Sequence, residues 1–498
     1  MKYQSTRNSS ISVDAAEAIK NGISPEGGLY VPAQIPQISL SFIADLCNLD
    51  YKKRASKILG LFLTDYSAEE LDFCASNAYA DAKFGSSDTA PVKSLNDNLN
   101  ILELWHGPTC AFKDMALQIL PYLLKKAIEK TGENNEVVIL VATSGDTGKA
   151  ALEGFKDVEG TRIQVFYPVD GVSEIQKLQM TTQEGANVSV CAVNGNFDDA
   201  QTGVKRIFTN NEYKKELNKR GYTFSSANSI NWGRLAPQIV YYFSAYCDLL
   251  SAKKINLGDK INIVVPTGNF GNILAAYYAK IMGLPVNKLI CASNSNNILT
   301  DFINTGVYDR NRNFYTTVSP SMDILISSNL ERLLYHLTDR NDKLVSEYMT
   351  SLNETGRYEV SDTVKNKIGE IFVGGCCDDA DTAKTINKYF SEYSYVADTH
   401  TAVALNVYEQ YVAKTSDDTV TVIASTANPF KFNKAVLSAI KSDIDVDSVD
   451  EFKLLELLSE NGKITVPSQL DSLKSKEVRF SAVCSKEDMQ AQTDKFLD

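Results

Sequence analysis

Apolar runs of strand length alternate with amphipathic stretches along most of the chain after residue 92. The continuous apolar runs lie at 137–142, 163–168, 187–193, 261–265, 289–292 and 420–424. Stretches with apolar positions at helical spacing lie between them, among others at 149–155, 174–182, 197–208 and 273–282. Buried strands that alternate with helices are typical of βαβ units and of mainly parallel sheets. The pattern therefore predicts an α/β fold over this part of the chain.

The first 91 residues lack this alternation. Helical patterns recur at 13–21, 39–47, 52–62 and 68–84, whereas 29–32 is an extended piece that ends at a proline. Turn-forming residues at 85–91 predict a linker. We therefore expect a mostly helical N-terminal region (1–91), a smaller α/β domain (92–250) and a larger α/β domain (251–498). Two further expectations are a disordered terminus at 1–7 and one long helix at 321–338.

Composition and charge narrow the class of protein. The chain has 498 residues, 44% of them hydrophobic and 22% charged, which is ordinary for a globular protein. A formal net charge of −12 argues against binding to nucleic acids or anionic membranes. Nine scattered cysteines without a C-x-x-C motif, and three histidines, give no support to a disulfide framework or a metal site. Without a signal peptide or a membrane-length apolar run, a reduced, cytoplasmic protein is expected.

Lys113 ends the loop 106–114, where an amphipathic stretch begins. The N-terminal end of a helix favours anions, so a lysine at this position is electrostatically disfavoured. Burial beside Ala111 and Phe112 would further disfavour its ammonium form. A partly neutral lysine is a nucleophile that typically forms a Schiff base with a carbonyl compound. The alternative is a surface lysine whose stem lies along apolar neighbours.

Two glycine loops follow predicted strands and precede predicted helices. They are SGDTG at 144–148 and GNFG at 268–271. Backbone N–H groups in such turns converge on anions, and the helix dipole adds to the attraction. Neither loop is a G-x-G-x-x-G motif, and the first is no Walker A loop because Thr143 and Ala150 occupy positions that the motif reserves for glycine and Ser/Thr. Two small anionic groups are therefore expected rather than a nucleotide, with sterically required turns as the alternative.

Two more segments carry polar groups at places where ligands collect. Thr426 follows the predicted strand at 420–424, and ligands in α/β folds lie at the carboxyl ends of strands. Arg234 lies near a helix start, where a bound phosphate would explain a cation, and Asn231 precedes it. A capped turn and a solvated arginine are the structural alternatives.

Taken together, these segments resemble the threonine synthase family. The resemblance rests on HGPTCAFKD (106–114), SGDTG (144–148), NSINW (228–232), GNFGN (268–272) and DTHTA (398–402), in this order. The segments 3–7 and 27–32 also fit the long branch of the family, which includes yeast and enteric bacteria. The resemblance runs from residue 3 to about 430, and the last sixty residues carry no usable motif.

The resemblance implies a fold type II enzyme that depends on pyridoxal 5′-phosphate (PLP) and is similar to the tryptophan synthase β subunit. Lys113 would form the imine with PLP, beside Phe112, and Thr426 would hydrogen-bond the pyridine nitrogen. The domain 92–250 would lie on the substrate side, and the domain 251–498 would bind the PLP phosphate. The residues that would hold this phosphate are Gly268, Asn269, Phe270, Gly271 and Asn272.

The resemblance also implies a substrate, O-phospho-L-homoserine, which would be converted with water to L-threonine and phosphate. Residues 144–147 would meet the substrate carboxylate or the PLP hydroxyl: Ser144, Gly145, Asp146 and Thr147. Residues near the substrate phosphate would be Ser5, Thr6, Asn231 and Arg234. Many relatives of the wider fold have asparagine where Asp146 stands. His106 is expected to hold the loop rather than to take part in the chemistry.

Several alternatives remain open at this point. The chain could be another fold type II PLP lyase, such as a serine or threonine deaminase or a phospholyase, or a non-catalytic relative that binds ligands. As a partner, only a small-molecule substrate is expected, and the chain would be a monomer or a homodimer.

Overall fold

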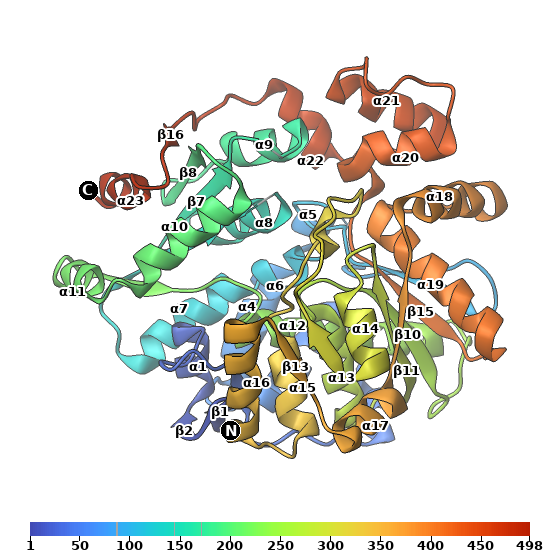
Figure 1. The fold of residues 1–498 in the computed structure, drawn as a ribbon, viewed down its shortest axis with the longest axis horizontal. Coiled ribbons are helices and arrows are strands. Elements are labelled where there is room, and N and C mark those ends of the chain that lie inside the picture. The colour runs from blue at the N-terminus through green and yellow to red at the C-terminus, as the bar shows by residue number, and fades with distance from the viewer. Residues whose placement is uncertain (86–87, 144, 171) are drawn as a thin grey trace.

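The N-terminal region combines a small sheet with five helices in the computed structural model, which describes residues 1–85, 88–143, 145–170 and 172–498 (Figure 1). The sheet is antiparallel, in the order β2 (Asn8–Val13), β1 (Tyr3–Ser5) and β3 (Tyr30–Pro32). The helices are α1 (Ala15–Asn21), α2 (Leu40–Cys47), α3 (Tyr51–Phe62), α4 (Ala68–Ala78) and α5 (Asp81–Phe84). The expected disorder at 1–7 is wrong, because Tyr3, Ser5 and Thr6 are completely buried.

A six-stranded sheet forms the centre of the larger lobe. Its order is β14 (Phe372–Cys376), β11 (Val286–Ser293), β10 (Ile261–Pro266), β15 (Thr421–Ser425), β5 (Leu99–Glu103) and β4 (Val92–Ser94). All neighbours are parallel except the edge pair β4–β5. The associated elements are α12 (Trp232–Ser251), α13 (Gly271–Met282), α14 (Ile298–Thr305), α15 (Leu330–Leu337), α16 (Asp342–Thr355), α17 (Asp362–Ile371), α18 (Asp379–Tyr393), α19 (Thr399–Thr415) and a two-stranded antiparallel sheet of β12 (Val307–Asp309) and β13 (Arg357–Glu359).

A second sheet is wholly parallel and belongs to the smaller lobe (Figure 1). Its order is β16 (Val483–Cys484), β8 (Val188–Val193), β7 (Thr161–Pro168), β6 (Glu136–Ala142) and β9 (Tyr222–Ser225). The helices of this part are α6 (Asp114–Leu117), α7 (Leu120–Thr131), α8 (Asp146–Phe155), α9 (Glu174–Thr181), α10 (Phe197–Thr209) and α11 (Asn211–Lys219). The C-terminal segment adds α20 (Asn433–Ile440), α21 (Glu451–Gly462), α22 (Ser468–Asp471) and α23 (Met489–Leu497). The α/β prediction with parallel sheets is therefore confirmed.

Sheet membership does not follow the predicted domain limits. Strands β4 and β5 precede the smaller lobe in sequence, yet β5 pairs with β15 of the larger lobe and β4 pairs with β5. The division at residues 91 and 250 stays a prediction. Within the described residues, none of the helices is both long and apolar enough to cross a membrane.

The single helix expected at 321–338 is wrong. A short 3₁₀ turn at Pro320–Met322 is separated from α15, which begins only at Leu330. Between them, Ser327 donates to the carbonyl of Gly268 at 2.7 Å, and Asn329 donates to that of Asn269 at 3.0 Å. Side chains of this kind offer the backbone alternatives to a helix. The apolar pattern alone could not show that these residues hold another loop.

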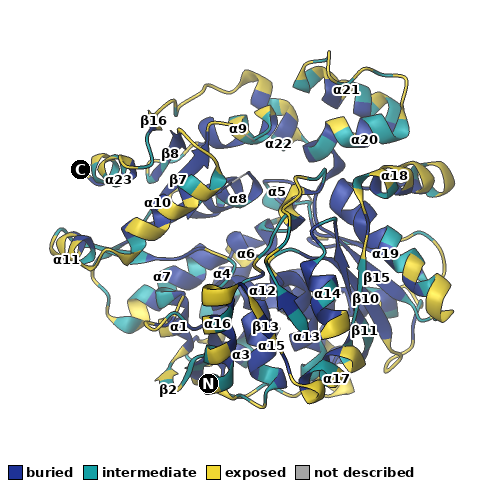
Figure 2. Ribbon diagram, viewed as in Figure 1, coloured by how far each residue is buried: buried dark blue, intermediate teal, exposed yellow. Residues whose placement is uncertain are grey.

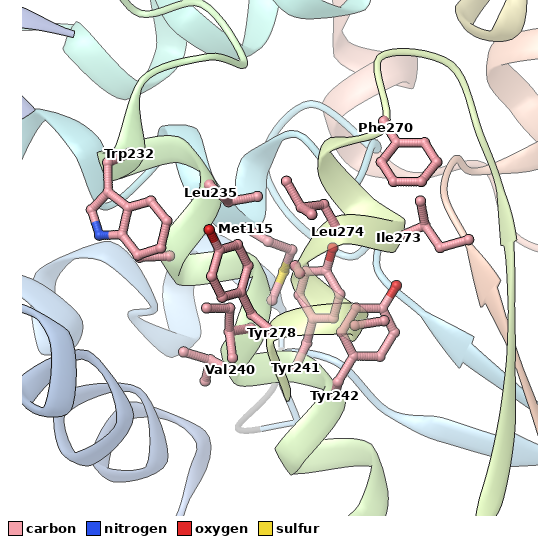
Figure 3. Packing of buried hydrophobic residues seen from close by; sticks show 14 of the residues in the cluster. Met115, Trp232, Leu235, Val240, Tyr241, Tyr242, Phe270, Ile273, Leu274 and Tyr278 are labelled. Carbon is pink, nitrogen blue, oxygen red and sulfur yellow. The ribbon is translucent and has the colours of Figure 1, made fainter. Parts of the chain in front are cut away.

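Helix α12 joins the N-terminal region to the larger lobe through a buried aromatic cluster. Trp232, in its first turn, makes edge-to-face contacts with Tyr3, Phe62 and Tyr278 at centroid distances of 5.4, 5.5 and 5.3 Å. Figure 3 shows this side chain together with Tyr241 and Tyr242 of α12 and Tyr278 of α13, and Figure 2 shows that the two helices are mostly buried. The position of the first turn of α12 is therefore fixed by packing.

Helix α8 approaches α6 closely enough to require a glycine. A Cβ atom at Gly154 would lie 2.0 Å from the carbonyl oxygen of Leu117. We predict that Gly154→Ala lowers the free energy of unfolding by about 1–3 kcal/mol, because the helices must move apart. Urea unfolding followed by the fluorescence of the two tryptophans measures the change.

Gly369 in α17 provides the matched control. It is exposed, and a Cβ atom there would meet nothing within 4 Å. Gly369→Ala should raise the free energy of unfolding by up to about 1 kcal/mol through helix propensity. Equal effects of the two substitutions would contradict the assigned contact.

Candidate active site

Lys113 lies at the point where its loop enters α6, and its side chain is 12% exposed. Its Nζ atom donates a long hydrogen bond to Ser321 Oγ at 3.4 Å and lies 3.7 Å from Asp146 Oδ2. The ring of Phe112 is 5.0 Å away. The same small cavity is lined by His400, Thr426 and Ala427. The amine thus lies between residues from four distant parts of the sequence.

Burial lowers the pKa of Lys113. Asp146 opposes this effect, and the positive charges of Lys431 and Arg234 add to it. Desolvation of the charged form was the cause expected from the sequence, and the structure adds the charges of Arg234, which the sequence had assigned to the substrate phosphate, and of Lys431, which it had not assigned. The lowered pKa makes the amine a better nucleophile and base near neutral pH.

The loop before Lys113 is organised by a buried carboxylate. Asp114 accepts hydrogen bonds from the backbone N–H and the hydroxyl of Thr109, both at 2.8 Å. Burial raises the pKa of Asp114 to about 6. Gly107 is required here, because its Cβ would lie 2.6 Å from the Asp114 side chain. His106 instead bonds Glu103 Oε2 at 2.9 Å, outside the cavity, which agrees with a role in holding the loop.

The loop at 268–272 presents the N-terminus of α13. Phe270 precedes this helix in a left-handed conformation, with φ of 60°. Gly268 is required because the carbonyl oxygen of Ser321 would lie 2.5 Å from a Cβ atom. The first N–H groups of a helix have no acceptor within it, and they attract anions. The carbonyls of Gly268 and Asn269 are held by Ser327 and Asn329, so the loop is braced from outside.

Three buried side chains near the starts of α12 and α13 have donors without acceptors among the described residues: Trp232 through Nε1, which lies in the aromatic cluster, and the two polar side chains Arg234 and Asn272. Asn272 accepts from the hydroxyls of Tyr241 and Tyr242 at 2.6 and 2.5 Å, but its Nδ2 atom is unpaired. Arg234 donates from Nη1 to the carbonyl of Ala227 at 2.8 Å, whereas its Nε atom is unpaired. Burial lowers the pKa of Arg234 to about 10. Unpaired buried donors are costly, so these positions fit phosphate groups of ligands.

The loop at 145–148 belongs to the smaller lobe. Thr143 Oγ1 accepts from the N–H groups of Gly145 and Gly148, both at 3.0 Å, and thereby shapes the turn. Asp146 and Thr147 begin α8. Asp146 lines the cavity with Lys113, whereas Ser144 lies outside the described residues.

Thr426 follows β15, as the sequence predicted. Its carbonyl accepts from the N–H of Phe112 at 2.8 Å, and Ala427 forms a bridge with Ala111. These contacts fix the end of β15 directly beside Lys113.

Three other predicted substrate contacts are occupied within the protein. Asn231 donates from Nδ2 to the carbonyls of Ile19 and Ser226 and caps α12 through Oδ1. Ser5 donates to Glu26, and Thr6 donates to Glu331. Their roles toward a substrate phosphate stay predictions.

Sequence reasoning missed three residues of the site: Ser321, His400 as a part of it, and Lys431. The N–H of Ser321 donates to His400 Nε2 at 3.1 Å, which leaves Nδ1 as the donor to Asp398 at 3.0 Å. His400 is therefore neutral in this arrangement, with its proton on Nδ1. Lys431 forms an ion pair of 2.7 Å with Asp146. The histidine was visible in DTHTA, but no motif pointed to Ser321 or Lys431.

Comparison with known proteins agrees with the geometry along the whole chain. Family models match residues 2–79 (threonine synthase N terminus), 89–426 (pyridoxal-phosphate dependent enzyme) and 401–493 (threonine synthase, C-terminal). The chain belongs to the threonine synthase family. The resemblance and the PLP-dependent fold type are confirmed, and the C-terminal match covers most of the segment in which sequence reasoning found no motif.

Relatives and solved structures of the family support this assignment. Threonine synthase from Schizosaccharomyces pombe is 36% identical, over 89% of this chain and 90% of its own length. Human threonine synthase-like 1 is 40% identical over 88% of this chain. The match spans only 60% of the length of that relative, which is the longer protein. The PLP-bound threonine synthase from Brucella melitensis superposes with a TM-score of 0.88 at 34% identity, covering 100% of this chain and 99% of its own. Yeast threonine synthase gives 0.88 at 33% identity, covering 100% and 98%.

The cofactor of this family is PLP, and the residues present fit it. The aldehyde of PLP requires an amine, which Lys113 offers, and its phosphate requires donors, which α13 and Asn272 offer. Thr426 presents a hydroxyl, rather than a carboxylate, at the end of β15.

The buried Asp114 allows a test of the loop that carries Lys113. We predict that Asp114→Ala lowers the free energy of unfolding by about 1–3 kcal/mol, because the N–H and hydroxyl of Thr109 lose their acceptor. Asp114→Asn retains one acceptor oxygen and should cost less. Urea unfolding measures both changes, and equal losses would contradict the assigned role of the carboxylate oxygens.

Proposed function

We propose that this chain is a cytoplasmic threonine synthase that converts O-phospho-L-homoserine and water to L-threonine and phosphate. The observation that carries the proposal is the buried amine of Lys113 beside Asp146, with unpaired donors on Arg234 and Asn272. Family membership along the whole chain agrees with this reading. The substrate is a small molecule with two anionic groups, and the net charge of −12 gives no support to nucleic acids as partners.

When bound, PLP supplies an electron sink for the negative charge that develops on the substrate carbon. The PLP phosphate is assigned to the N–H groups of 268–272 and to Asn272 Nδ2. Thr426 serves the pyridine nitrogen; a hydroxyl there leaves this nitrogen unprotonated, so the charge is less completely drawn into the ring. Phe112 lines the cavity with its ring 5.0 Å from the Lys113 amine, beside the position assigned to PLP.

Lys113 carries the proton transfers in this proposal. Once its amine is released by the incoming substrate, it removes the proton from Cα and returns protons at later steps. Burial lowers its pKa, which suits a base that must be neutral before each removal. Arg234 binds the substrate phosphate and stabilises its departure from Cγ. The N–H groups at 145–147 receive the substrate carboxylate.

The last parts of the proposal are the roles of four further residues and the oligomeric state. Ser5, Thr6 and Asn231 are assigned to the surroundings of the substrate phosphate, and Ser144 is assigned to the substrate carboxylate. We propose that the enzyme works as a monomer or a homodimer, because the site is built from one chain.

The identity of the product is the first test. The purified chain loaded with PLP should release phosphate and form threonine from O-phospho-L-homoserine. Lys113→Ala should lower the rate by at least about 10²–10⁴-fold, the range typical of a lost acid–base group. Borohydride reduction and peptide mass spectrometry should locate PLP on Lys113 of the unsubstituted protein.

Lys125→Ala is the control, since this lysine is paired with Glu159 on the surface of α7. It should leave the rate unchanged. Formation of 2-oxobutyrate and ammonia instead of threonine would identify a phospholyase. This alternative is worth the assay, because the human relative with 40% identity carries the name threonine synthase-like. A chain that takes up no PLP would refute the proposal.

Arg234 provides a second test of the assignment. Arg234→Met should raise KM for O-phospho-L-homoserine by about 10-fold or more, since a charge-assisted contact to phosphate is lost. Inorganic phosphate should protect the unsubstituted protein against thermal unfolding more than it protects this variant. The control is Arg54→Met, because Arg54 is equally buried but paired with Asp248 at 2.7 Å. If KM rises in Arg54→Met but not in Arg234→Met, the assignment of Arg234 to the substrate phosphate is contradicted.

A further inference from the structure

Lys431 is a completely buried lysine whose three donors all have acceptors. It lies in the 3₁₀ turn Pro429–Phe432, which follows the Thr426 segment. Its Nζ atom donates to Asp146 Oδ1 at 2.7 Å, to the carbonyl of Thr109 at 3.0 Å and to Gln179 Oε1 at 3.1 Å. A buried ammonium is stable only when it is paired and hydrogen-bonded in this way. Lys431 therefore has no N–H left for a ligand.

The two oxygens of Asp146 face different partners. Oδ1 accepts from Lys431 and, at 3.1 Å, from Gln176 Nε2. Oδ2 faces Lys113 at 3.7 Å, which is beyond the distance of an ordinary hydrogen bond. The carboxylate is thus hydrogen-bonded to Lys431 and acts on Lys113 mainly through its charge.

We propose that Lys431 is a positioning residue, which holds Asp146 ionised and away from Lys113, so that the Lys113 amine stays free to attack and to accept protons. This inference deepens the proposed function and rests on the role of Lys113 in it. Asp146 and Lys431 together form a neutral unit beside the reactive amine.

The physical basis is competition between two lysines for one buried carboxylate. Without Lys431, the nearest cation to Asp146 would be Lys113, and a direct pair would favour the ammonium form of Lys113. The charge of Lys431 also acts on Lys113 itself and disfavours its proton. Both effects have the same sign, so removal of Lys431 raises the pKa of Lys113.

The contacts also join the two lobes of the molecule. Lys431 follows β15 of the six-stranded sheet, whereas Asp146 and Gln179 belong to α8 and α9 beside the five-stranded sheet. Thr109 belongs to the loop that carries Lys113. One ammonium therefore fixes the distance between the lysine loop and the carboxylate that influences it.

The test measures uptake of PLP by the apo protein as a function of pH, without any substrate. The rate rises as Lys113 loses its proton, and the titration of PLP itself is common to all variants. Lys431→Met should move the midpoint up by about one pH unit or more. Asp146→Asn should move it down, and the double variant should lie below Lys431→Met, because no carboxylate is left to bind Lys113.

Lys149→Met is the matched control. Lys149 is a buried lysine of the smaller lobe that is bonded to Glu153 at 3.0 Å and to Gln183, without contact to Lys113. Its loss should lower stability but leave the midpoint where it is. If Lys431→Met does not fold, Lys431→Gln removes the charge and retains amide donors, and the same upward shift is expected.

An unchanged midpoint in the Lys431 variants would overturn the proposal, as would a midpoint in the double variant equal to that of the Lys431 single variant. The outcome is independent of the reaction that the loaded enzyme catalyses. A shift with no threonine formed would refute the proposed function alone, whereas threonine formation with no shift would refute this inference alone.

Discussion

The imbalance of buried charge around Lys113 is the constraint on which the site depends. Three basic side chains, Lys113, Lys431 and Arg234, meet here, and among the described residues the carboxylate that faces the two lysines is Asp146. Unpaired charge in a low-dielectric interior is expensive, so bound anions stabilise this arrangement. Ligands that carry phosphate and carboxylate groups supply this charge. Burial lowers the pKa of Lys113, and the charges of Lys431 and Arg234 lower it further, which links binding of anions to reactivity.

The fold holds this unfavourable arrangement in place by rigid packing at every element that enters the cavity. Trp232 fixes the first turn of α12 with Arg234, and Gly154 allows α8 with Asp146 to lie against α6. The carboxyl end of β15 is bound to the lysine loop through the carbonyl of Thr426. Each of these groups therefore comes from an element whose position is set by packing or by backbone contacts as well as by the charges of the site.

The pattern of apolar residues predicted helices and strands well where it was uninterrupted, as in the buried strands 137–142 and 261–265. They failed where polar side chains hold distant loops: Ser327 and Asn329 interrupt the expected helix 321–338, and Thr6 buries the terminus by bonding Glu331. In the site, the two glycine loops were recognisable from the sequence, and so were Lys113 and Arg234, because a cation at the start of a helix is electrostatically disfavoured. Lys431 was not, because its neighbours in sequence carry no glycine loop and its partners lie hundreds of residues away.

The residue at position 146 decides whether the loop at 145–148 carries a charge beside the reactive amine. An asparagine at this position would be neutral by itself, whereas the aspartate is neutral only together with Lys431. In the proposed function, a substrate anion binds beside Arg234 and the N–H groups of α8 and brings negative charge close to Asp146. The positive charge of Lys431 offsets the repulsion between this anion and the Asp146 carboxylate. A composite neutral group thus allows a carboxylate to remain beside the reactive amine while substrate anions arrive and leave.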